Sequence, residues 1–102
     1  LPMDRRPGAK FLLLEPKRGV WRYRTYIADY DKDKMAAEFE RSGLIEKAGV
    51  WAKCIIRSMY EERDFAARCV ALAWRIAASE KFDGAVLPEE YWERAARELG
   101  II

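Results

Sequence analysis

Histidine is absent from the 102-residue chain, and cysteine occurs only at Cys54 and Cys69. Without histidine the chain cannot build a Ser-His-Asp or Cys-His catalytic arrangement, and it lacks the commonest transition-metal ligand. Two cysteines are too few for a disulfide scaffold, and both stand among apolar helix-forming residues, so we expect buried free thiols. No zinc motif is present, and we expect neither a metal nor a cofactor.

Long apolar runs and glycine-rich phosphate-binding motifs are missing as well. No stretch approaches the roughly 20 residues of a membrane-spanning helix. The run FLLL is shorter than the about 7–15 apolar residues of a secretion signal. Neither GxxxxGK[ST] nor GxGxxG occurs. The composition, 51% hydrophobic and 35% charged, predicts a single soluble domain over residues 1–102, cytoplasmic and without a membrane partner.

Charge is distributed unevenly along the chain. Residues 1–30 contain seven Lys or Arg against three Asp or Glu, a net charge of +4. Because the whole chain carries +2, residues 31–102 carry −2. A basic N-terminal part on a slightly acidic remainder favours contact with a polyanion or an acidic surface.

Periodicity and turn signals predict an α+β fold, a β-hairpin followed by a bundle of about four helices. The parts expected are an irregular segment (1–9), the hairpin (10–30) and a helical body (31–102). We place Pro16 at the second position of the hairpin turn. The helices are expected near 34–42, 44–60, 62–80 and 88–99, with the third in the middle. A lone hairpin is marginal in water, so the helices or a partner should cover one face.

Alternation along the second strand separates an apolar side from a basic side. The side that we expect to pack on the helices carries Trp21, Tyr23, Thr25 and Ile27. The side that should face solvent or a ligand carries Arg22, Arg24, Tyr26 and Ala28. Together with Lys17 and Arg18 at the tip, the residues Arg22, Arg24 and Tyr26 form the candidate site for nucleic acid or an acidic protein surface. Plain solvation of an edge strand is the alternative.

Four tryptophans, spread one per main element, allow two interpretations. They could form a core of large rings, or some could be exposed anchors in an interface, where Trp and Arg are enriched. Trp74 and Trp92, each close to an arginine, are the candidate interface residues. The alanine-rich segment AARCVALAWRIAAS permits close helix approach, within one chain or between two copies as a homodimer.

Acidic residues cluster at two predicted helix starts, where the helix dipole alone favours them. The clusters are Glu61, Glu62 and Asp64, and Glu89, Glu90 and Glu93. Carboxylates could serve as acid and base or bind a divalent metal. Helix capping is the simpler explanation, so we assign no catalytic and no metal site.

These observations favour a small non-enzymatic binding or regulatory module. Its helical body would self-associate or dock a protein, and its basic hairpin would contact nucleic acid or an acidic protein surface. The alternatives are an interaction subunit or inhibitor without nucleic-acid binding, and, less favoured, a carboxylate-based enzyme.

Overall fold

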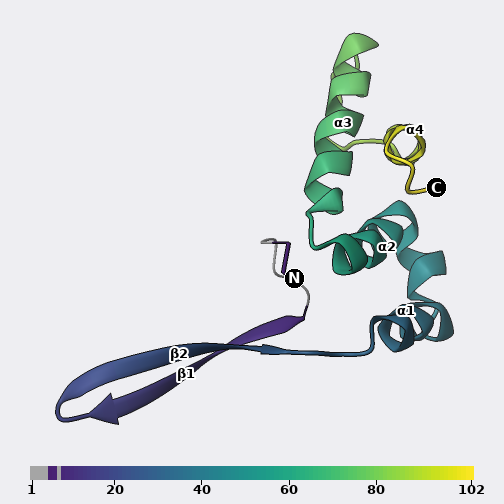
Figure 1. Ribbon diagram of the computed structural model, residues 1–102. Helices are drawn as coiled ribbons and strands as arrows, with labels where there is room; N and C mark the ends of the chain where they lie inside the picture. The colour runs from purple at the N-terminus through teal and green to yellow at the C-terminus, as the bar shows by residue number, and fades with distance from the viewer. Residues whose placement is uncertain (1–4, 7) are drawn as a thin grey trace.

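The computed structural model describes residues 5–6 and 8–102, and the predicted irregular segment 1–9 lies partly outside these residues. The chain forms an antiparallel two-stranded hairpin followed by four helices, which confirms the predicted α+β fold (Figure 1). The elements are β1 (Ala9–Lys17), β2 (Val20–Ala28), α1 (Lys32–Arg41), α2 (Leu44–Glu61), α3 (Phe65–Ser79) and α4 (Glu89–Glu98). Among the described residues, no helix combines the length and apolarity needed to cross a membrane.

The hairpin turns at Arg18 and Gly19, two positions past the turn expected with Pro16 at its second position. Both residues have positive φ, 51° and 78°, as a two-residue type I′ loop requires. Pro16 lies inside β1 opposite Trp21, so its predicted place in the turn is wrong. A two-stranded ribbon has only edge strands, and an edge strand tolerates a residue without a backbone N–H group.

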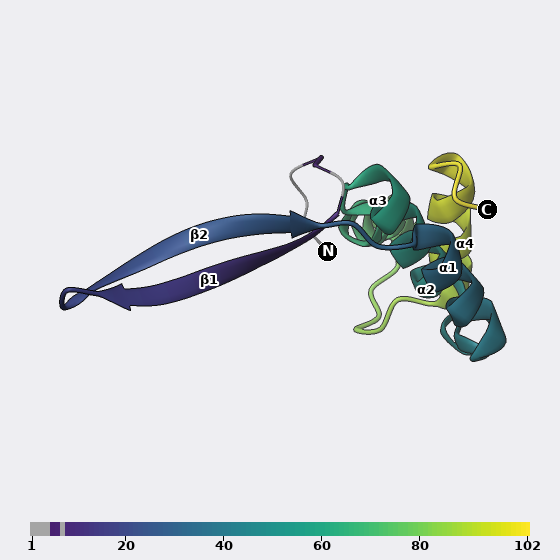
Figure 2. The same ribbon diagram turned by 60° about the horizontal axis from the view of Figure 1, so that its bottom comes forward.

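The hairpin projects away from the helices as a free ribbon (Figures 1 and 2). All nine residues of each strand are exposed, and neither strand packs against a described helix. The Cα radius of gyration is therefore 18.1 Å, where a compact chain of this length has about 13 Å. The expectation that the Trp21 side packs on the helices is wrong, since Trp21 is 68% exposed.

The interior of the helical body is made largely of small side chains. The fully buried apolar residues are Ala52, Cys54, Cys69, Ala73, Ala77, Ala95 and Ala96. Helices joined by alanine and cysteine approach closely. Trp21, Trp51 and Trp74 are all more than 40% exposed, so the core is not built around tryptophan. Its buried large rings are Phe65 and Tyr91. Both thiols are buried and free, as predicted, and burial raises the pKa of Cys54 to about 12.

Helix α2 is the centre of the body, because it contacts α1, α3 and α4, whereas α3 contacts only α2 and α4. The prediction of a central third helix is wrong on this point. Gly49 breaks α2 with non-helical angles, φ 52° and ψ −129°. A Cβ atom at Gly49 would lie 3.1 Å from Oε1 of Glu89, so glycine lets α4 approach the break.

The start of α3 is fixed by polar contacts from two sides. Asp64 caps the helix by accepting from the Ala67 amide at 2.8 Å. The Ser58 hydroxyl donates to the Cys54 carbonyl at 2.8 Å and accepts from the Phe65 amide at 2.9 Å. The third helix therefore begins at Phe65 and not near residue 62 as predicted.

Candidate functional site: the hairpin and the groove at its base

The register of the two strands defines two faces of the hairpin. Paired residues of an antiparallel ribbon point to the same side, and successive residues alternate between sides. The basic face carries Ala9, Phe11, Leu13, Glu15, Lys17, Val20, Arg22, Arg24, Tyr26 and Ala28. The apolar face carries Lys10, Leu12, Leu14, Pro16, Trp21, Tyr23, Thr25 and Ile27. Candidate and non-candidate residues of β2 thus lie on opposite sides of one thin sheet.

The arginines of the basic face are not engaged by the protein itself. Glu15 lies directly opposite Arg22 and Leu13 opposite Arg24. No hydrogen bond or ion pair joins either guanidinium to another residue within the part of the chain that the structure describes. Other arginines do find partners, and Arg41, for example, binds Glu38 through two nitrogens. Arg22 and Arg24 are therefore available to an external anion.

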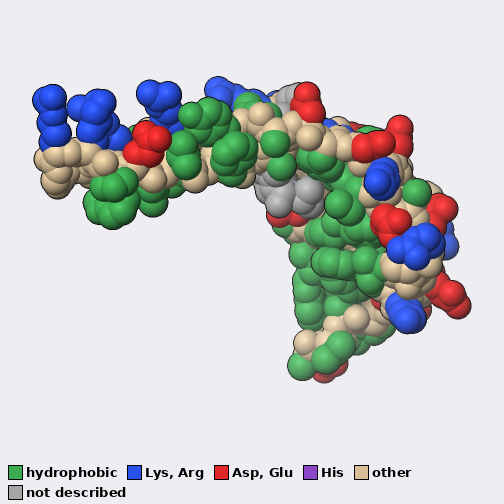
Figure 3. Space-filling view, turned by 90° about the horizontal axis from the view of Figure 1, so that it is seen from below, with side chains coloured by type: hydrophobic (Ala, Val, Ile, Leu, Met, Phe, Trp, Pro, Cys, Tyr) green, Lys and Arg blue, Asp and Glu red, His purple; other side chains and the backbone are tan. Residues whose placement is uncertain are grey.

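The tip extends this set of cations. Lys17 ends β1 and Arg18 is the first loop residue, and both are exposed. Figure 3 shows Lys and Arg side chains along one side of the hairpin and at its tip, with hydrophobic side chains gathered on the other side. Three of the five predicted site residues, Lys17, Arg18 and Arg22, therefore lie in the outer half of the ribbon, and Arg24 lies at its middle.

Tyr26 lies nearer the base of the basic face and is only 37% exposed. Its ring stacks on Phe11, with centroids 5.2 Å apart and planes inclined by 17°. Sequence analysis missed Phe11, because a cross-strand pair can be assigned only when the turn is placed correctly. A two-residue turn at Arg18 and Gly19 would have given the pairing.

The apolar face exposes an unusual amount of hydrophobic surface. Trp21 and Tyr23 are 68% and 72% exposed. Leu12, Leu14 and Ile27 are each more than half exposed. Contiguous apolar area of this kind on a folded protein marks an interaction site.

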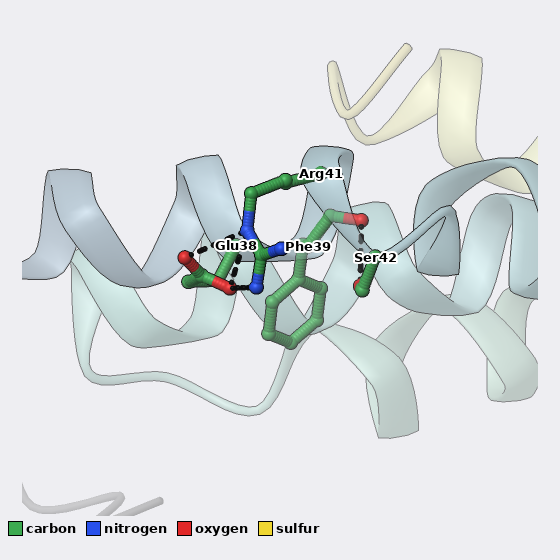
Figure 4. A network of polar contacts seen from close by, with 4 residues as sticks. All are labelled: Glu38, Phe39, Arg41 and Ser42. Atoms are coloured by element: carbon green, nitrogen blue, oxygen red, sulfur yellow. Dashed lines mark hydrogen bonds and ion pairs between the residues drawn. The ribbon is translucent and has the colours of Figure 1, made fainter.

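A second apolar surface, the apolar groove, lies where the hairpin joins the helices. Its volume is about 400 Å³, and its lining comes from the hairpin base, α1 and α2: Ala9, Tyr30, Met35, Phe39, Ile55, Ile56 and Met59. Figure 4 shows Phe39 in the last turn of α1, between the Glu38–Arg41 ion pair and Ser42. The Ser42 hydroxyl donates to the Phe39 carbonyl at 3.3 Å, which closes the helix beside the groove.

The two candidate interface tryptophans belong to the opposite end of the body. Trp74 on α3 is 41% exposed and inclines against Phe82, with centroids 6.4 Å apart. Trp92 on α4 is half-buried against the core, and its carbonyl lies 3.7 Å from the Cys69 sulfur. The structure does not bring either residue to the hairpin.

The acidic clusters take part in local structure. Asp64 caps α3, Glu62 accepts from Lys32 Nζ at 2.8 Å, and Glu61 pairs with Arg57. Over residues 5–6 and 8–102, acidic and cysteine side chains form no group of three or more suited to a metal ion. The Arg94 guanidinium lowers the pKa of Glu80, which joins the last turn of α3 to α4.

Comparison of the chain with protein-family models, with curated protein sequences and with solved structures yields no match in any of the three searches.

Proposed function

We propose that the protein is a non-enzymatic nucleic-acid-binding module whose hairpin is the binding element. The observation that carries the proposal is the unpaired state of Arg22 and Arg24 on a ribbon that stands clear of the body. With Lys17 and Arg18, they place four cations between the middle of the hairpin and its tip. An isolated ribbon with free guanidinium groups suits a polyanion, because each phosphate contact releases counterions.

The shape of the hairpin supports a nucleic acid over a small anion. A two-stranded ribbon fits the major groove of a duplex, which is about 12 Å wide. Arg22 and Arg24, two positions apart in β2, are separated by about 7 Å, close to two base-pair steps along the helix axis. A cavity of about 560 Å³ on the hairpin is lined by Arg6, Lys10, Phe11, Leu12, Thr25, Tyr26 and Ile27, and its lining includes neither Arg22 nor Arg24. The open cationic edge therefore favours an extended ligand.

The test is a fluorescence anisotropy titration with a short DNA duplex, a single strand and an RNA hairpin. Arg22→Ala with Arg24→Ala should weaken binding to each ligand that the wild type binds. The matched control is Arg41→Ala with Arg97→Ala, which removes the same charge from ion-paired helix positions. Equal affinities for the wild type and the hairpin variant would overturn the proposal.

The exposed apolar face favours a second candidate, an interaction subunit without nucleic-acid binding. Trp21 and Tyr23 are the most exposed aromatic residues of the hairpin and are of the type that dominates binding energy at protein interfaces. On this alternative the anisotropy titrations show no binding to nucleic acid, and a protein partner co-purifies with the wild type. Loss of that partner with Trp21→Ser and Tyr23→Ser would select this candidate.

A further inference from the structure

We infer that two copies of the chain exchange hairpins, so that the apolar face of each hairpin lies in the apolar groove of the other copy. The inference concerns the side of the ribbon opposite Arg22 and Arg24, and it does not depend on what the basic face binds. It identifies the occupant of both apolar surfaces at once. Three observations carry it: surface area, charge and position.

The exposed area is larger than a folded monomer of this mass has. The chain exposes 7580 Å² at a mass of 11.9 kDa. A compact monomer of that mass exposes about 6,000 Å², so the excess is roughly 1,600 Å² per chain. Tightly associated homodimers bury about 1,000–2,500 Å² on each partner. Exchange of hairpins would remove an excess of this size.

Charge favours a hairpin–body contact over a hairpin–hairpin contact. Residues 9–28 contain five Lys or Arg and one Glu, a net charge of +4. Residues 31–102 contain twelve basic and fourteen acidic side chains, a net charge of −2. A hairpin on the partner's body brings opposite net charges together, which favours the approach of the two copies, while the groove lining itself is uncharged and receives the apolar face.

Position makes the contact reciprocal. The groove is lined by Tyr30, just after β2, and by Ala9, the first residue of β1, so it opens at the base of the hairpin. Figure 3 shows hydrophobic side chains on the side of the helical body that faces the hairpin. A hairpin entering one groove brings its own groove close to the partner's hairpin. A twofold axis then closes the assembly with two identical contacts.

The occupant of the groove is tested with three variants. The molar mass of each is measured by light scattering after size-exclusion chromatography, at a protein concentration of tens of micromolar. The hairpin variant is Trp21→Ser with Tyr23→Ser, and the groove variant is Met35→Ser with Ile56→Ser. Val86→Ser, at an 82% exposed loop position outside both surfaces, is the control. We expect twice 11.9 kDa for the wild type and the control, and 11.9 kDa for the hairpin and groove variants.

Mixing the two monomeric variants tests the pairing itself. The hairpin variant keeps an intact groove and the groove variant keeps an intact hairpin, so an equimolar mixture regains one of the two contacts. A mixed pair of twice the monomer mass is expected, with weaker affinity than the wild-type dimer. Circular dichroism checks the fold, and Met35→Ser alone, at a 45% exposed side chain, replaces the groove double variant if helix signal is lost.

Each other result overturns the inference. A monomeric wild type leaves both surfaces to a different partner. A dimeric groove variant indicates hairpin–hairpin pairing, and a dimeric hairpin variant indicates groove–groove pairing. Failure of the mixture to pair at any concentration excludes exchange. None of these results changes the anisotropy comparison of Arg22→Ala with Arg24→Ala, so the two proposals fail separately.

Discussion

The salt dependence of nucleic-acid binding follows directly from the four cations of the hairpin. If Lys17, Arg18, Arg22 and Arg24 each neutralise one phosphate of a duplex, log K falls against log salt with a slope of about −3.6. Between about 50 and about 200 mM salt, one hairpin then loses about 150-fold in affinity. The side chains are exposed and unpaired in the described residues, so the full slope is available.

Removing two of the four cations should halve this slope. For Arg22→Ala with Arg24→Ala we expect a slope of about −1.8 and a loss of about 12-fold over the same salt range. The control Arg41→Ala with Arg97→Ala has the same net charge as the hairpin variant and should keep the wild-type slope. Its arginines pair with Glu38 and Glu93 on the helices and lie away from the ribbon.

The assay is anisotropy of a labelled short duplex, titrated at several salt concentrations. A short ligand admits one hairpin, so the slope counts the phosphates contacted by a single ribbon. Equal slopes for the hairpin variant and the wild type would refute the assignment of contacts to β2. A reduced slope in the helix control would place the contacts on the body.

Three further predictions concern the helical body. Gly49→Ala should destabilise the fold by about 1–3 kcal/mol in urea denaturation, because a residue with a side chain is strained at a positive φ with ψ −129°. The control Gly43→Asn, at φ 74° and ψ 12°, should have little effect. An unchanged urea midpoint for Gly49→Ala would contradict the break in α2 at this residue. Phe65→Ala should lower the free energy of unfolding by about 3–5 kcal/mol, since the ring is buried in the core and only 5% exposed. A shift of the urea midpoint smaller than that of Gly49→Ala would contradict this core role. Cys54 is fully buried and its pKa is raised to about 12, so it should react with a thiol reagent at pH 8 much more slowly than in the unfolded chain. The core tolerates the neutral thiol, so the stability that this thiol contributes should be lost as the pH rises above about 9, and rapid labelling of the native protein would contradict its burial.

The number, order and kind of the elements were predictable, and most helix ends to within about two residues, although the start of α3 was placed about three residues too early. Asp31 accepts from the Lys34 amide at 2.9 Å and starts α1, and Asp64 starts α3 in the same way. Gly43, with φ 74°, separates α1 from α2. Capping residues and left-handed glycines act within a few positions of the chain, and the sequence therefore contains the information needed to place them.

The direction of the hairpin was not predictable for the complementary reason. Alternation along β2 tells which residues share a side with Trp21, but it does not tell what covers that side. The cover depends on how closely the helices pack, and that depends on pairs such as Ala73 and Ala95, which are both fully buried. Phe11 was missed because its cross-strand partner Tyr26 can be assigned only when the position of the turn is known.

The two faces of the ribbon make a further prediction when the exchanged dimer and the nucleic-acid site are considered together. Contacts on the apolar face leave both basic faces outward. A dimer therefore presents eight hairpin cations, four from each copy. A duplex long enough to meet both hairpins should then show a salt slope of about −7, while a short duplex keeps about −3.6. Trp21→Ser with Tyr23→Ser retains Arg22 and Arg24 but should not dimerise. It should therefore give the single-hairpin slope on both ligands, and a doubled slope in this variant would show that the two basic faces act together without exchange of the apolar ones.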